Sequence, residues 1–278
     1  MHPLSSSFFT VLCICGTSAF SAEFGQARLK SLTITSELMD SPVINSISYN
    51  EQGLPSRYDI APVDPDVDYA KTTFEFEYRD DGQLIRRISY AQVPNGSPKW
   101  THEFAYNSQT PPLLIRVDGT SSFGEKDQRT YTYDAQNRPM SVAQIHTTHT
   151  GENIKSSTSF TYGSDGNILS GTITNSTSAD TGKFQIQYDE NGLEVGSVHT
   201  VPNEGSIEAK ITRSDNNKTE VQTFTGPNNT VSAQKIVSQY EVSSCRIPKL
   251  TDGFVVMALF DHPTGFNPSD ACKKVVTN

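Results

Sequence analysis

The chain has 278 residues, a formal net charge of −9 at pH 7 and a hydrophobic fraction of 35%. This acidic balance argues against nucleic acids and anionic membrane surfaces as partners. The sequence has a high content of Ser, Thr, Asn and Gln and little helical periodicity. Both features favour strands and polar turns over a helical core.

The first 22 residues form a separate segment without Lys, Arg, Asp or Glu. An apolar run from Phe8 to Cys15 precedes small residues that end at Ala22. The pattern predicts a signal peptide, residues 1–22, that is too short for a transmembrane helix. We therefore expect an exported protein, periplasmic or secreted, whose mature chain has no transmembrane segment.

Residues 23–40 are expected to lead into the body of the protein and to cover its first open edge. Leu29, Leu32, Ile34 and Leu38 fit either a strand or a short helix. The sequence leaves these two alternatives open.

Residues 41–240 contain a repeated unit. In one copy, Phe184, Ile186 and Tyr188 alternate with polar residues, which is the period of a half-buried strand. The turn residues that follow end at Gly192, where a positive φ suits a tight hairpin. Six such tyrosines lie 29, 28, 27, 29 and 26 residues apart. The repeat positions are Tyr49, Gly53, Tyr78, Gly82, Tyr106, Tyr133, Tyr162, Gly166, Tyr188 and Gly192.

A degenerate seventh copy has Arg213 where the tyrosine is expected. The sequence thus predicts an all-β antiparallel meander of about seven hairpins with a period of about 27 residues. Because sheet twist accumulates over so many strands, we expect a spiral or partly closed shell.

The array resembles the YD repeats of the RHS family, in which a strand is followed by Tyr-Asp-x-x-Gly and a second strand. Asp follows the tyrosine only at Asp134 and Asp189, so the array is diverged. The resemblance implies a spiralling β-shell, a bacterial source and a link to carbohydrate binding or to toxin systems.

Two kinds of aromatic residue are distinguished. The repeat tyrosines recur at each level and are expected to pack inside the sheet. Trp100, Tyr58 and Tyr69 fall outside the repeat, and we expect them to form a surface that contacts a glycan or an envelope or secreted protein.

An acidic linker joins the first two repeats. Asp64, Asp66, Asp68 and Glu75 resemble the ligand spacing of a calcium loop, although Tyr69 stands where that loop requires Gly. A solvated linker without calcium is the alternative, and no other cofactor is expected.

The remaining features point away from catalysis. The sequence has no Gly-x-Ser-x-Gly, His-Glu-x-x-His or phosphate-binding motif, and its carboxylates fall mostly in predicted turns. We expect a non-catalytic structural or interaction module. The alternatives are a hydrolase of envelope polysaccharide, and an inhibitor or shell fragment of a toxin system.

Residues 241–278 differ from the repeats and are expected to form a cap. Cys245 and Cys272 are the cysteines that remain after removal of the signal peptide, and in an exported chain they are expected to form a disulfide.

Overall fold

The computed structural model describes residues 24–36, 41–64, 66, 71–91, 98–190, 192–214, 217–242 and 272–276. They form one antiparallel sheet of seventeen strands. The strands are β1 (Phe24–Ser36), β2 (Val43–Tyr49), β3 (Pro55–Pro62), β4 (Thr72–Tyr78), β5 (Leu84–Ala91), β6 (Lys99–Tyr106), β7 (Leu114–Ser121), β8 (Lys126–Tyr133), β9 (Pro139–Thr147), β10 (Asn153–Tyr162), β11 (Ile168–Asn175), β12 (Ser178–Tyr188), β13 (Glu194–Val201), β14 (Gly205–Ser214), β15 (Asn217–Thr225), β16 (Val231–Val242) and β17 (Cys272–Val276).

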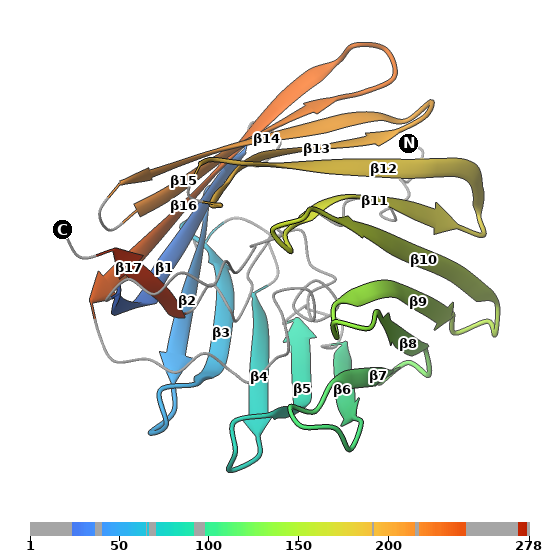
Figure 1. Cartoon of the computed structure of the whole chain (residues 1–278), viewed down its shortest axis with the longest axis horizontal. Helices are drawn as coiled ribbons and strands as arrows, with labels where there is room; N and C mark the ends of the chain where they lie inside the picture. The colour runs from blue at the N-terminus through green and yellow to red at the C-terminus, as the bar shows by residue number, and fades with distance from the viewer. Residues whose placement is uncertain are drawn as a thin grey trace.

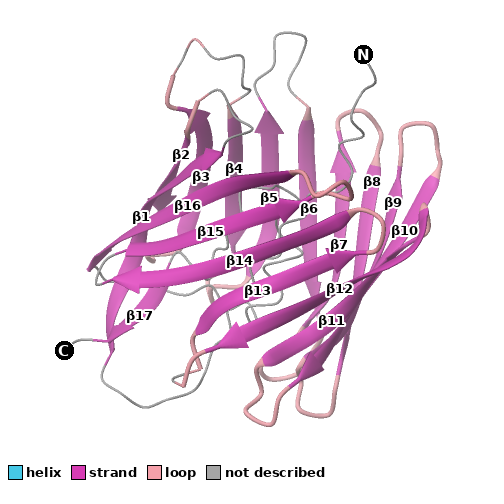
Figure 2. Cartoon of the chain, turned by 90° about the horizontal axis from the view of Figure 1, so that it is seen from above, coloured by secondary structure: helices cyan, strands magenta, loops and turns pink. Residues whose placement is uncertain are grey.

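The sheet closes on itself. Strands β1 to β16 follow one another as neighbours, and β16 pairs with β1 from Ala27↔Val242 to Ser36↔Gln234. Strand β17 adds to β1 at Phe24–Arg28, beside the shorter β1–β2 pairing. The result is a sixteen-stranded barrel in which β3 to β7 and β12 to β16 lie on opposite sides of the ring (Figures 1 and 2).

The expected spiral or partly closed shell is therefore wrong, and so is the shell that the YD-repeat resemblance implied. Hairpins with a repeat turn account for β2 to β15, and β1 and β16 complete the ring. The lead-in thus supplies a wall strand of the barrel. Pairing on both sides removes the free edges that an open sheet leaves.

The two faces of the sheet differ in exposure. The repeat tyrosines and the apolar residues of the same parity face inward, and most of the buried core lies on β2 to β8. A second cluster, Ile168, Phe184 and Ile186, lies on β11 and β12. Outward residues such as Ser157, Ser159 and Thr161 are exposed, whereas the buried residues include apolar side chains and also polar ones such as Arg87 and Gln222.

Side chains next to the repeat tyrosines shape the turns. The Oδ1 atom of Asp134 accepts hydrogen bonds from the backbone N–H groups of Gln136 and Arg138, both at 2.9 Å. Asn137 has φ +62°, the left-handed conformation that Gly53, Gly82, Gly166 and Gly192 adopt at the same turn position. An Asp or Asn after the tyrosine therefore replaces backbone pairing that the turn itself cannot make.

The tyrosine hydroxyls connect successive hairpins. Tyr162 Oη donates to the carbonyl oxygen of Pro139 at 2.6 Å, one hairpin back, and Tyr188 Oη donates to Ile168 at 2.9 Å. Tyr106 and Tyr133 make the same contact to Leu84 and Leu114. Arg213 replaces the tyrosine in the seventh copy, and its Nη1 donates to the carbonyl oxygen of Glu194 at 2.5 Å. The degenerate repeat thus keeps the hydrogen bond with a different donor.

The C-terminal predictions fall largely outside this description. Cys272 begins β17, whereas Cys245 lies outside the described residues, and no cysteine pair is seen within them. The disulfide predicted between Cys245 and Cys272 is thus not among the features that the described residues show. Within the described part of the chain, no helix is long and apolar enough to cross a membrane.

Candidate binding site on the inner face

A row of polar residues crosses the inner face of five neighbouring strands. Cα register aligns Arg87 of β5, His102 of β6, Gly119 of β7, Asp127 of β8 and His146 of β9. Because side chains alternate between the two faces of a strand, these aligned residues project toward the same side. The pairing of β5 to β9 thus brings ionisable groups from four of these strands together inside the barrel.

We call Arg87, His102, Asp127 and Arg129 the charged cluster. Each of these residues is at most 3% exposed. Nη2 of Arg129 lies 2.8 Å from Oδ2 of Asp127, and Nε2 of His102 lies 3.9 Å from the same oxygen. Nη2 of Arg87 lies 3.0 Å from Nδ1 of His102. Two guanidinium groups, one carboxylate and one imidazole therefore share a buried site.

The electrostatics of the charged cluster keep its histidine neutral. Burial, followed by the charges of Arg87 and Arg129, lowers the pKa of His102 far below its ordinary value. Asp127 approaches His102 but does not reverse this shift. The two guanidinium groups therefore add to the effect of burial in disfavouring a protonated imidazole.

Trp100 covers the charged cluster from one side. Its ring stacks on His102 with the centroids 5.6 Å apart and lies 6.1 Å from the ring of His146. Gly119 makes room beside His102, since a Cβ atom there would lie 2.7 Å from Nε2 of the imidazole. The absence of that side chain fixes how closely the rings and the charges approach each other.

Solvent reaches the border of the charged cluster. Trp100, Gln144, His146 and Ser156 are only half-buried. Nε2 of Gln144 donates to Oδ1 of Asp127 at 2.7 Å, and Oγ of Ser156 donates to Oε1 of Gln144 at 3.2 Å. The border of the charged cluster thus combines an aromatic ring with hydrogen-bonding side chains.

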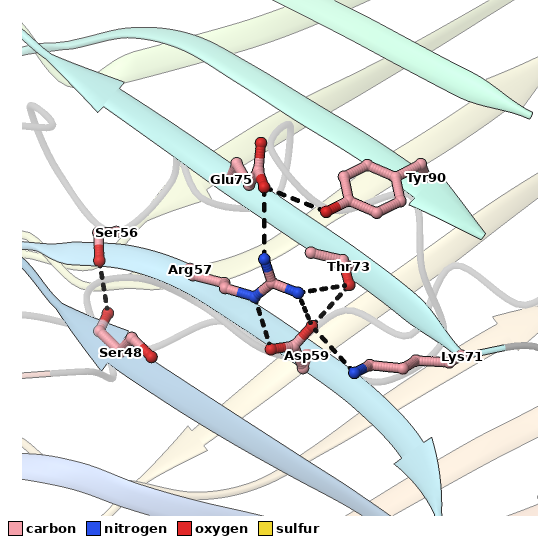
Figure 3. Close-up of polar contacts among 8 residues, drawn as sticks. All are labelled: Ser48, Ser56, Arg57, Asp59, Lys71, Thr73, Glu75 and Tyr90. Atoms are coloured by element: carbon pink, nitrogen blue, oxygen red, sulfur yellow. Dashed lines mark hydrogen bonds and ion pairs between the residues drawn. The ribbon is translucent and has the colours of Figure 1, made fainter. Parts of the chain in front are cut away.

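The outer face carries a different polar network (Figure 3). Arg57 donates two hydrogen bonds to the carboxylate of Asp59, at 2.7 and 2.9 Å, and one to Glu75 at 3.4 Å. Thr73 also donates to Asp59, and Tyr90 donates to Glu75. Burial opposes ionisation of Asp59, but the bonds from Arg57 and Thr73 outweigh it and lower its pKa. These groups satisfy one another, so we interpret the network as structural.

Elsewhere the outer face is hydroxyl-rich. Exposed cross-strand pairs such as Ser157–Thr174 and Ser159–Thr172 are hydrogen-bonded at 2.8 and 2.7 Å. Ion pairs such as Arg86–Glu77 also lie there. Apolar residues such as Ile44, Ile145 and Val221 are exposed on this face as well.

The predicted aromatic surface is not assembled. Tyr58 is fully buried on the inner face, where its ring lies 5.9 Å from that of Phe74. Trp100 is also on the inner face, and Tyr69 lies outside the described residues. Of the two that are described, only Trp100 borders the candidate site.

The predicted calcium ligands are placed only in part. Asp64 accepts a hydrogen bond from the backbone N–H of Asp66 at 3.0 Å, which is an ordinary turn contact. Glu75 is engaged by Arg57 and Tyr90, and Asp68 lies outside the described residues. Of the residues whose positions are described, no three His, Cys, Asp or Glu form a metal-binding group.

Sequence reasoning missed the charged cluster, because none of its four residues belongs to a motif that was singled out. A signal was present: His102 and Arg129 each stand four residues before a repeat tyrosine, and so share its inward parity. Charged residues at positions that are apolar in other repeats, such as Phe184, indicate a polar centre inside.

Comparison with known proteins adds little to this description. No protein-family model and no curated protein matches the chain. Among solved structures, a porin-like protein from Bacteroides vulgatus is similar, with 11% identity and a TM-score of 0.40. The match covers 77% of this chain and 98% of that one. At this level the likeness carries no functional argument, and the barrel is defined here by its own strand pairing.

Proposed function

We propose that this protein is an exported, non-catalytic interaction module that binds a glycan on the inner face of its barrel. The observation that carries the proposal is the half-buried Trp100 beside the charged cluster. A flat aromatic ring next to hydrogen-bonding side chains suits a sugar, which has apolar ring faces and polar edges. Gln144, His146 and Ser156 provide such polar edges.

The outer face supports the same proposal indirectly. Its ion pairs and hydroxyl pairs satisfy one another, whereas the inner face combines an accessible aromatic ring with buried charge. We therefore assign glycan recognition to the inner face of the barrel. No observation on the described residues favours the hydrolase alternative. Two of their buried carboxylates are engaged in ion pairs, Asp127 with Arg129 and Glu220 with Lys218.

A glycan array probed with the purified protein tests the proposal. Trp100→Ala is expected to abolish binding while the protein keeps its circular dichroism spectrum. Phe123→Ala is the matched control, because Phe123 is 62% exposed in the turn between β7 and β8. An array without signal, or binding that survives Trp100→Ala, would direct attention to a protein partner or a structural role.

A further inference from the structure

We propose that an uncharged part of the outer face mediates weak, reversible self-association, and that its partner is the same surface of a second copy of this chain. This surface comprises the outward side chains of residues 130–132, 140–143, 157–161 and 169–174 on β8 to β11, and we call it the neutral face. It lies on the outside of the barrel, so the inference does not depend on the glycan site proposed on the inner face.

The neutral face is a continuous grid of small or apolar side chains. One row of aligned residues crosses the four strands, through Thr132, Ser141, Ser159 and Thr172. A second uncharged row, two residues along each strand, runs from Thr130 on β8 to Thr174 on β11. Met140 and Leu169, which are 51% and 43% exposed, lie beside the turns at one end of the grid. The surface therefore offers apolar area without charge across four strands.

Charge is unevenly distributed over the outer face. Ion pairs such as Arg86–Glu77 lie on β4 and β5. The neutral face has no charged residue, and Lys155 on β10 and Lys183 on β12, which lie at its margin, are exposed lysines. The chain as a whole carries a net charge of −9, which opposes the association of two copies. This opposition is weakest where neither copy presents an acidic side chain.

The absence of charge also favours a second copy over a different protein as the partner. A different partner is steered and oriented by complementary charges, which this face lacks. Two identical faces related by a two-fold axis need only be complementary to themselves, and an uncharged grid meets that requirement for polarity. The central parts of protein interfaces are likewise depleted of charged residues.

The hydroxyl groups of the neutral face are already paired with one another. Thr132 and Ser141 are hydrogen-bonded at 2.7 Å, and so are Ser159 and Thr172. Because these hydroxyl groups have partners within the face, contact with a second copy displaces water at a smaller cost than it would from unpaired hydroxyl groups. The pairing thus prepares a polar surface for burial.

The size of the neutral face determines how strong the association is. Four strands about 4.8 Å apart, with a rise of about 3.4 Å per residue, give a face of roughly 20 Å by 20 Å. Two copies would bury roughly 800 Å² together, which is less than the roughly 1,200 Å² of a stable interface. We therefore expect a dimer that dissociates on dilution.

Sedimentation velocity of the purified protein over a range of concentrations measures this association. We expect a reversible equilibrium between monomer and dimer. The dimer is expected to become more stable as the salt concentration rises, because salt screens the repulsion between two acidic copies. Association that weakens as salt rises would show that ion pairs hold the two copies together, and it would refute the role of the neutral face.

Substitutions of Ser159, in the middle of the neutral face, locate the contact. A charge at this position is doubled by the two-fold symmetry, so Ser159→Lys and Ser159→Glu are each expected to weaken dimerisation about tenfold or more. Because Ser159→Lys makes the chain less acidic, its effect cannot come from greater overall repulsion. Ser46→Lys and Ser46→Glu are the matched controls, since Ser46 is exposed on β2, on the opposite side of the ring (Figure 1). Both controls are expected to dimerise as the parent protein does.

The circular dichroism spectrum of each variant shows whether it is folded, and Thr130→Lys, also exposed on the neutral face, replaces any Ser159 variant that is not. A protein that stays monomeric at every concentration would overturn the proposal. A dimer that survives charge on the neutral face, or is lost equally in the Ser46 variants, would place the contact elsewhere and overturn it as well. Trp100→Ala is expected to dimerise normally, so failure of this proposal leaves the glycan function intact.

Discussion

The neutral, buried His102 predicts how the stability of the barrel depends on pH. In the folded protein, burial and the charges of Arg87 and Arg129 hold the pKa of this imidazole far below that of an exposed histidine. In the unfolded chain the pKa returns to about 6.5. Below that pH the imidazole binds a proton in the unfolded state but not in the folded state. The free energy of unfolding therefore falls as the pH falls.

The size of the effect follows from this difference. Each pH unit below about 6.5 lowers the free energy of unfolding by about 1.4 kcal/mol for one such group. Between pH 6.5 and 4.5 His102 therefore contributes a loss of roughly 2–3 kcal/mol. His199, whose pKa is also lowered by burial, adds to the same trend.

Urea unfolding at pH 7.5, 6.5, 5.5 and 4.5 measures this effect when the protein is compared with its His102→Gln variant. The variant is expected to be less stable than the parent protein at pH 7.5. At pH 4.5 its free energy of unfolding is expected to equal or exceed that of the parent protein, because the variant lacks the imidazole that binds a proton only in the unfolded state. His149→Gln is the control, because His149 is exposed in a turn. Parallel curves for the parent and His102→Gln would refute the reasoning.

Two further predictions concern the packing of the barrel. Tyr162→Phe removes the hydroxyl that donates to Pro139 and should cost about 1 kcal/mol in chemical unfolding; an unchanged midpoint would show that this bond adds nothing. Gly171→Ala should destabilise the barrel by roughly 1–3 kcal/mol or prevent folding, since the new Cβ would lie 2.1 Å from the carbonyl oxygen of Ser159. Gly182→Ala, whose Cβ would meet His199 Nε2 at 3.1 Å, is the milder control, and equal effects of the two would contradict the steric argument.

The local features of the fold could be predicted from the sequence because they depend on residues that are close together in the chain. The alternation that ends at Tyr188 predicts a strand with one buried face, and Gly192 predicts a turn with positive φ, both of which are present. Hydrogen bonding by Asp134 to its own turn follows from the same local chemistry.

The closure of the barrel and the candidate site could not be predicted from the sequence, because both depend on residues that are far apart in the chain. Nothing near Ile34 indicates that it will align with Ile236, since a strand with an alternating pattern pairs equally well with many others. The charged cluster similarly draws its members from β5, β6 and β8. Inward parity predicts that His102 and Arg129 point into the barrel, but only the register brings them to one place.

The pairing of β1 with β16 also determines when the barrel can become complete. Ala27 and Val242 are more than two hundred residues apart in the chain, so the contact that closes the ring has a large loop-closure cost. Until the last strands arrive, the growing sheet has two free edges that can pair with other chains. A chain that is cut short before β16 would therefore keep most of its hairpins and lose its protection against aggregation.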